Sequence, residues 1–393
     1  MYIVGIDVAK RSHEAIVIDD SGSTVHKAFN FKNDADGFRK LFSVLDSVSA
    51  DPADFIIGME STSHYWLALF SNLTKSPYTV HMFNPIQSNA LRDMYIRQTK
   101  TDERDCFIIA EVIRFGRYSQ GSMPPADIYA LREMCRARFF MVDMTSDLKR
   151  KVIALLDQVF PEHETLFTDI FGLTSSALLC TCPTPAEILA VDTEKLIELI
   201  SVPSHKRFGR QKAEQIRSVA KKSFGVLLGN DAISGLIKQY MEHIRFSQQQ
   251  IMELDENIAA LFSKFDTPIT TVPGVGPVLG AAIFSEIGDI SRFRSAAKLA
   301  AFAGIDPSVR RSGEFSGIRN HMSKRGSPYL RRALWQASVI AALHDPALKA
   351  FFQKKRAQGK SYMNVIGHVT RKMASIIFAV LRDRTPYYVP DLN

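Results

Sequence analysis

The sequence predicts a mixed α/β N-terminal domain, then a long helical middle region, then a mainly α-helical C-terminal domain. Three observations support this order. Short apolar runs separated by turn residues fill the first 83 residues, two stretches of more than thirty residues with helical spacing follow, and a basic region rich in glycine turns comes last. A chain of 393 residues also suits two or three domains.

In the first region, three apolar runs at Tyr2–Asp7, Ala15–Asp19 and Thr24–Phe31 are typical of β-strands joined by short turns. Further along, helices and strands alternate. We expect a helix from Asn33/Asp34, a strand at Phe55–Met59, a helix at Tyr65–Leu73, a strand at Tyr78–Phe83, and helices at Pro85–Tyr95 and Glu103–Phe115. Three consecutive strands followed by alternation predict a mixed sheet rather than a strict βαβ repeat.

The middle region begins after Gly121–Pro125, a stretch typical of a domain boundary. Ile128–Phe160 contains neither proline nor glycine, and about Ala232–Phe265 is a second long helical run. Helices of this length usually pack as an antiparallel pair or a coiled coil, so we expect an arm or a dimerisation module. The predicted domains are therefore residues 1–122, 123–265 and 266–393.

Charge is unevenly distributed along the chain. The formal net charge is +8, but residues 294–384 hold eighteen Lys and Arg side chains against four acidic ones. This density favours a polyanionic partner such as DNA or RNA, although a solvated basic face without a partner remains open. The absence of a long apolar run, together with four scattered cysteines, predicts a soluble cytoplasmic protein with reduced thiols and no membrane span.

Four carboxylates stand where apolar runs end or a helix begins. Asp7 and Glu60 close predicted strands, while Asp102 and Asp105 share one face at a predicted helix start. Considered singly, each carboxylate is better explained as a turn former or a helix cap. Gathered at one edge of a sheet, the four would repel one another without a cation, and their hard oxygen atoms suit Mg²⁺ or Mn²⁺.

The last region carries two motifs that suit phosphate binding. A tight turn containing Gly274 and Gly276 precedes a helix, so its backbone N–H groups could hold a DNA phosphate as in a helix-hairpin-helix element, or serve packing only. The basic segment Gly304–Gln336 follows. Its candidate phosphate-binding side chains are Arg310, Arg311, Arg319, Lys324 and Arg325.

The motifs GIDVAK, GMEST and KTDERDCFIIA, together with the segment around RRSGEFSG, resemble the two blocks of transposases of the IS110 insertion-sequence family, to which pilin-gene invertases are related. The resemblance implies a ribonuclease-H-like (RuvC-like) N-terminal domain that binds Mg²⁺, or Mn²⁺, through Asp7, Glu60, Asp102 and Asp105. It implies that Ser312 is the nucleophile of a DNA recombinase. It further implies donor and target DNA, a structured guide RNA, and a homodimer or tetramer as partners.

Three rival hypotheses remain open. A Holliday-junction type endonuclease would use the four carboxylates with water alone. A sugar kinase or actin-like ATPase shares the Gly-Ile-Asp first strand, but the sequence lacks the G-x-x-x-x-G-K-[ST] phosphate loop and a second glycine-rich phosphate turn. A non-catalytic nucleic-acid scaffold would bind DNA without needing any of the carboxylates.

Overall fold

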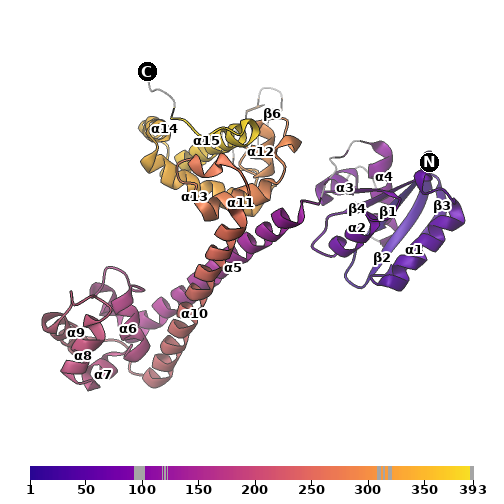
Figure 1. Ribbon diagram of the computed structural model, residues 1–393. Coiled ribbons are helices and arrows are strands. Elements are labelled where there is room, and N and C mark those ends of the chain that lie inside the picture. Colours follow the sequence, from indigo (N-terminus) through magenta and orange to yellow (C-terminus); the bar gives the residue numbers. More distant parts are fainter. Residues whose placement is uncertain are drawn as a thin grey trace. The chain divides into compact units, whose positions relative to one another are not determined.

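The structure is a computed structural model that describes residues 1–92, 102–116, 118, 121, 123–307, 311–312, 315–316 and 321–389. It describes the backbone alone at Asp102 and at residues 311–312 and 315–316. The chain divides into two compact units, Met1–Met123 and Pro124–Asn393, each described by itself below (Figure 1).

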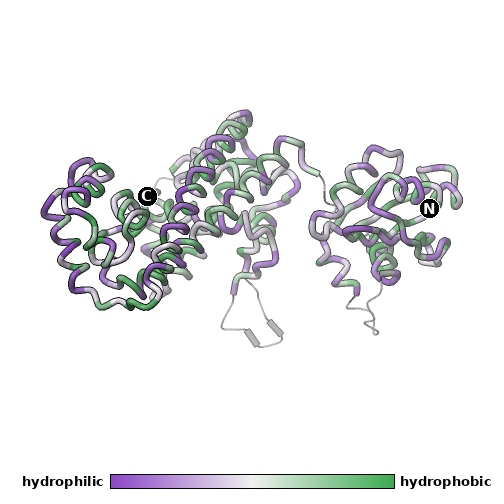
Figure 2. Tube along the Cα trace, turned by 90° about the horizontal axis from the view of Figure 1, so that it is seen from below, coloured by the Kyte–Doolittle hydropathy of each residue, from purple (hydrophilic) through white to green (hydrophobic). Residues whose placement is uncertain are grey.

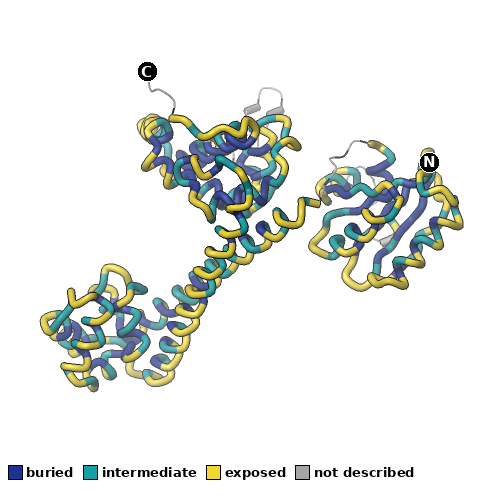
Figure 3. The backbone as a smooth tube through the Cα atoms, in the orientation of Figure 1, coloured by how far each residue is buried: buried dark blue, intermediate teal, exposed yellow. Residues whose placement is uncertain are grey.

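Unit 1 is built around a mixed five-stranded sheet in the order β3-β2-β1-β4-β5. β1 pairs antiparallel with β2, and β2 with β3, whereas the β1–β4 and β4–β5 pairs are parallel. β1, β2 and β4 are largely buried, whereas most of β3 is exposed or half-buried (Figure 3). Their bounds are Tyr2–Asp7 (β1), Ser12–Asp19 (β2), Thr24–Lys32 (β3), Phe55–Glu60 (β4) and Thr79–Phe83 (β5).

Helices cover both faces of this sheet. α1 (Ala35–Val48) and α2 (Trp66–Leu73) bury their apolar side chains against one face. α4 (Asp102–Phe115) packs on the other, and α3 (Pro85–Arg92) contacts α4. α1 begins where the Asp34 carboxylate accepts a hydrogen bond from the Gly37 backbone N–H at 2.8 Å. A 3₁₀ turn, Pro52–Asp54, leads into β4.

Unit 2 is helical apart from one short hairpin within its described residues. Two long helices, α5 (Ala126–Val159) and α10 (Asn230–Phe262), pack along each other, and polar and apolar residues alternate along both (Figure 2). Arg138 of α5 binds the Asp255 carboxylate of α10 through two hydrogen bonds, the longer being 3.0 Å. α6 (Leu173–Thr181), α7 (Pro185–Ala190), α8 (Thr193–Ser201) and α9 (Arg210–Lys222) form one apolar core with the end of α5 and the start of α10.

A second apolar core in unit 2 joins the start of α5 and the end of α10 to the C-terminal helices. Arg136 of α5 binds the buried Glu286 carboxylate, and Arg332 binds Asp143 of α5 at 2.7 and 2.8 Å. The C-terminal elements are α11 (Pro277–Ile287), α12 (Ala296–Phe302), the hairpin strands β6 (Arg311–Ser312) and β7 (Phe315–Ser316), α13 (Pro328–His344), α14 (Pro346–Ala357) and α15 (Tyr362–Asp383).

The predicted mixed α/β layer with a mostly helical remainder is confirmed. The predicted helix over Pro85–Tyr95 is α3, seen to Arg92, and the rest of that range lies outside the described residues. The four cysteines are all free. Across the described part of the chain, no helix combines the length and apolarity that a membrane span requires.

Candidate functional site

Two paired glycines let α4 lie directly against the sheet. Gly5 of β1 and Gly58 of β4 are opposite each other in the parallel register. A Cβ atom on Gly5 would lie 2.1 Å from the carbonyl oxygen of Cys106, and one on Gly58 would lie 2.5 Å from Cγ1 of Ile113. Any side chain at Gly5 would therefore collide with the backbone of α4, and the glycine pair sets how close the helix comes.

This close contact brings the acidic residues to one edge of the sheet. Asp7 and Glu60 each follow their glycine by two residues, so both side chains leave the sheet on the face that α4 covers. The second half of α4, at Glu111, lies beside Gly22 in the β2–β3 turn, near the start of β1. The first turn of α4, with Asp105, therefore lies toward the carboxyl ends of β1 and β4.

Asp105 is neutralised by a cation of this chain. Only 7% of the residue is exposed, and Arg92 of α3 donates from Nη2 to its Oδ1 at 2.8 Å. The Nε atom of Arg92 is buried and has no hydrogen-bond partner within the described residues. The Arg92 guanidinium thus supplies the positive charge that a nearly buried carboxylate requires.

Removing this cation provides a test of metal binding. We expect Arg92→Ala to lower the free energy of unfolding by about 2–3 kcal/mol in EDTA, because a nearly buried carboxylate loses its partner. Magnesium at millimolar concentration should recover most of that loss by binding at the vacated carboxylate. Thermal unfolding in EDTA and in Mg²⁺ measures both effects.

The matched control is Arg39→Ala, which breaks an exposed ion pair with Asp36 in the same unit. We expect Arg39→Ala to lower the free energy of unfolding by well under 1 kcal/mol, and by the same amount with and without Mg²⁺. An equal loss for Arg92→Ala with and without Mg²⁺ would show that Asp105 does not bind the ion.

The described side chains do not form a complete coordination cluster. Within the ranges that the structure describes, no group of three or more His, Cys, Asp and Glu residues could hold a metal ion. Of the four predicted ligands, Asp7, Glu60 and Asp105 lie toward the same edge of the sheet, and Asp102 is the first residue of α4, but its side chain is outside the described residues. The Oε2 atom of Glu60 accepts a hydrogen bond from Thr62 at 3.2 Å.

A fifth carboxylate at this edge was missed by the sequence analysis. Glu14 of β2 lies directly opposite Asp7 in the antiparallel register. Burial, and then the charges of Glu14 and Asp7, raise the pKa of the Cys106 thiol to about 12. The available signal was the alternation in β2, since Glu14 shares a face with Ile16 and Ile18, which pack with α4.

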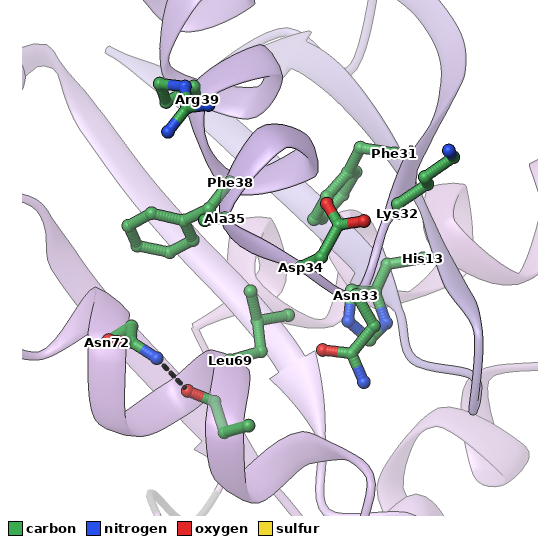
Figure 4. A pocket seen from close by; sticks show the side chains of 11 residues that line it. His13, Phe31, Lys32, Asn33, Asp34, Ala35, Phe38, Arg39, Leu69 and Asn72 are labelled. Atoms are coloured by element: carbon green, nitrogen blue, oxygen red, sulfur yellow. Dashed lines mark hydrogen bonds between the residues drawn. The ribbon is translucent and has the colours of Figure 1, made fainter.

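The opposite face of the sheet contains a separate hollow of about 410 Å³ between β2, β3, α1 and α2 (Figure 4). His13 lines it and is buried; burial lowers the pKa of this imidazole. Its Nδ1 accepts a hydrogen bond from the Ala9 backbone N–H at 3.3 Å. Because His13 precedes Glu14 on the strand, it faces away from the carboxylates, and the hollow is not part of the acidic edge.

In unit 2, the predicted nucleophile lies in a hairpin with a well-anchored base. Ser312 of β6 pairs with Phe315 of β7. At the base, Ser323 donates its backbone N–H to the Asp306 carbonyl at 2.9 Å and its hydroxyl to the Asp306 carboxylate, while Lys324 donates its backbone N–H to Gly304 at 3.0 Å. These bonds fix both ends of the segment that carries Ser312.

The predicted phosphate-binding residues fall into two groups. Lys324 and Arg325 are exposed at the hairpin base. Arg310 and Arg319, and the side chains of Arg311 and Ser312, lie outside the described residues.

The two glycines before α11 differ in their surroundings. Gly274 has φ +82°, and a Cβ atom there would lie 2.3 Å from the Ala337 carbonyl of α13, so this glycine serves the packing of the turn. Gly276 is the N-cap of α11 and is exposed with open space around it, which leaves the start of that helix accessible.

Comparison with known proteins decides the family. A family model described as a transposase, of the IS110 DEDD type, matches residues 4–161, and a second, described as the transposase IS116/IS110/IS902 family, matches residues 266–353. The chain belongs to the IS110/IS116 family of transposases. The two matches cover the acidic edge in one unit and the serine hairpin in the other.

Relatives of this transposase match along nearly its whole length. An uncharacterized 44.8 kDa protein of insertion element IS116 from Streptomyces clavuligerus is 25% identical over 97% of this chain and 94% of its own. The mini-circle putative transposase for IS117 from Streptomyces coelicolor is 25% identical over 97% and 94%. The pilin gene-inverting protein of Moraxella bovis is 24% identical over 98% and 97%. The family implies a DNA substrate and a divalent metal ion.

Proposed function

We propose that this transposase cuts and rejoins DNA through a metal-bound carboxylate cluster in a ribonuclease-H-like (RuvC-like) N-terminal domain and a serine nucleophile in the C-terminal region. The observation that carries the proposal is the Gly5–Gly58 pair under α4, because it directs the start of α4 toward the strand ends that carry Asp7 and Glu60. The sheet order β3-β2-β1-β4-β5 agrees with such a domain.

The donor set fits a hard divalent cation. Asp7, Glu60, Asp102 and Asp105 offer only carboxylate oxygens, which Mg²⁺ and Mn²⁺ prefer over softer metals. The charges of Asp7, Glu60 and Glu14 at one edge supply a reason for a cation to bind there. A bound ion would neutralise the scissile phosphate and stabilise its entering and leaving oxygens.

The serine step follows from the chemistry of a phosphodiester. The Ser312 oxygen attacks phosphorus, a serine–phosphate bond forms, and the bond to one deoxyribose oxygen breaks. The hydroxyl proton leaves to a base, and the departing oxygen takes up a proton. Attack by a deoxyribose hydroxyl of the partner strand reverses the step and releases Ser312. The cationic side chains proposed to hold this phosphate are Arg310, Arg311, Arg319, Lys324 and Arg325.

The proposed partners follow from charge and shape. The basic stretch 294–384 supports binding of donor and target DNA and of a structured guide RNA. The exposed start of α11 at Gly276, with Gly274 in the turn before it, supports a backbone phosphate contact of the helix-hairpin-helix kind. Exposed apolar side chains on the α5–α10 helix pair, such as Phe140 and Phe246, support assembly into a homodimer or tetramer.

Charge removal at the acidic edge tests the metal cluster. We expect Glu60→Gln to reduce recombination by about a hundredfold or more, because the amide keeps the shape but loses the charge that binds the ion. The measurement is the frequency of excised circles and target junctions in cells carrying the gene with its flanking DNA. Glu103→Gln is the matched control, since Glu103 is exposed on the first turn of α4.

Unchanged junction frequency for Glu60→Gln, at equal protein level, would contradict the proposed cluster. Loss of junctions in both variants would instead indicate that neutralising any acid near α4 disturbs the domain.

A further inference from the structure

A hollow of about 310 Å³ lies at the base of the serine hairpin, formed by the hairpin ends and by α15; we call it the stem pocket. Pro307 and Met322, the residues paired across the hairpin base, both line it. The volume is at the low end for pockets that bind small organic ligands, about 300–1,000 Å³. Its position beside the segment that carries Ser312 makes its chemistry relevant to the DNA that reaches this serine.

One face of α15 forms the wall of the stem pocket. Asn364, Gly367, His368 and Arg371 line it at positions i, i+3, i+4 and i+7 of the helix. A Cβ atom on Gly367 would lie 3.0 Å from Cε of Met322. Glycine in the middle of this helix thus leaves room for the hairpin base to come close.

The polar side of the stem pocket is cationic. Burial, and then the positive charges of Lys360, Lys355 and Arg371, lower the pKa of His368. Another imidazole, His321, lines the pocket as well, and no carboxylate is among its described lining residues. A site that places the Arg371 guanidinium beside the His368 imidazole attracts a phosphate group.

The remaining surface of the stem pocket is apolar, formed by Ile305, Met322 and Met363. A phosphate alone would gain nothing from these side chains, whereas a nucleobase would bury its face against them. The Asn364 amide adds a donor and an acceptor suited to the edge of a base.

We propose that the stem pocket is a subsite for one unstacked nucleotide of the DNA substrate, with its base against Met322 and Met363 and its phosphate against His368 and Arg371. The inference rests on the proposed function in one respect, since the nucleotide is placed next to the strand that Ser312 attacks. Binding of the nucleotide itself does not depend on that serine.

The test measures binding of small probes to the full chain. Ring-labelled histidine signals of His321 and His368, assigned by substitution, are followed by NMR during titration with thymidine 5′-monophosphate, thymidine and inorganic phosphate. We expect the mononucleotide to shift both signals at a concentration about tenfold lower than either fragment requires. Its phosphate should also raise the pKa of His368, because a nearby negative charge favours the protonated ring.

Arg371→Ala should weaken mononucleotide binding about tenfold, because the phosphate loses a charged hydrogen bond. Lys372→Ala is the matched control, since its Nζ lies over the Phe351 ring at 4.5 Å and it does not line the stem pocket. Equal affinity for inorganic phosphate and the mononucleotide would overturn the nucleotide subsite and leave an anion site. If none of the probes shifts the NMR signals of His321 and His368, both the nucleotide subsite and the anion site are overturned, whatever the Ser312 variant shows.

Discussion

Ser312→Ala is expected to abolish recombination, with a loss of at least about a thousandfold. The hydroxyl oxygen is the atom proposed to bond to phosphorus, and alanine has no atom that can replace it. The fold should be unaffected, because Ser312 contributes to the hairpin through its backbone pairing with Phe315. The measurement is sequencing of excised circles and target junctions in cells, at matched protein level.

A covalent-complex assay separates the nucleophile from its neighbours. Wild-type transposase denatured during reaction should carry a DNA strand bound through serine, and Ser312→Ala should carry none. Ser316→Ala is the matched control, since it lies on the opposite strand of the same hairpin and pairs with Arg311. Junctions that persist in Ser312→Ala would return the chemistry to the carboxylates and water, as in a junction-resolving endonuclease.

Gly5→Ala is expected to lower the free energy of unfolding of unit 1 by about 4 kcal/mol or more. The added Cβ atom would lie 2.1 Å from the carbonyl oxygen of Cys106 and 2.6 Å from the backbone nitrogen of Ala110. Backbone atoms of a buried helix cannot rotate away as a side chain can, so α4 must move off the sheet. Recombination should fall with it, because Asp105 moves with the helix.

Urea unfolding of the full chain followed by circular dichroism measures this loss. Gly209→Ala is the control, since nothing lies within 4 Å of a Cβ atom there. Gly58→Ala should lower the free energy of unfolding less than Gly5→Ala, because the added Cβ atom would collide with the side chain of Ile113 and not with the backbone. A Gly5→Ala variant as stable and as active as wild type would show that α4 is not held as described.

The order of strands and helices in unit 1 could be predicted because it depends on local pattern. Tyr2–Asp7 is one apolar run ended by an acid, and its limits agree with β1. The second strand was predicted to begin at Ala15, whereas β2 begins at Ser12 and so includes Glu14. Alternation also does not reveal which strands pair, so the opposition of Glu14 and Asp7 was missed. The role of Gly5 was equally hidden, because its neighbour in space is Cys106, about a hundred residues further along the chain.

The stem pocket could not be predicted for the same reason. It joins the two ends of a hairpin to the face of α15, and Met322 contacts Gly367 only once the helices have packed. Composition indicated a basic region between residues 294 and 384. It could not distinguish basic side chains that line a hollow from basic side chains that form ion pairs with other helices. Arg332 illustrates the second kind, since it binds Asp143 on α5.

The α5–α10 pair has a consequence for exchanging parts between relatives. The apolar core around α11 and α13 includes Leu131 and Phe139 of α5 and Phe262 of α10, all of which lie before residue 266. The segment that the second family model matches, residues 266–353, therefore shares its apolar core with α5 and α10 and does not form a separate core of its own. Chimeras of two such transposases should be joined near residue 124, where the compact units divide, since a junction at 266 would combine helices that never evolved to fit each other.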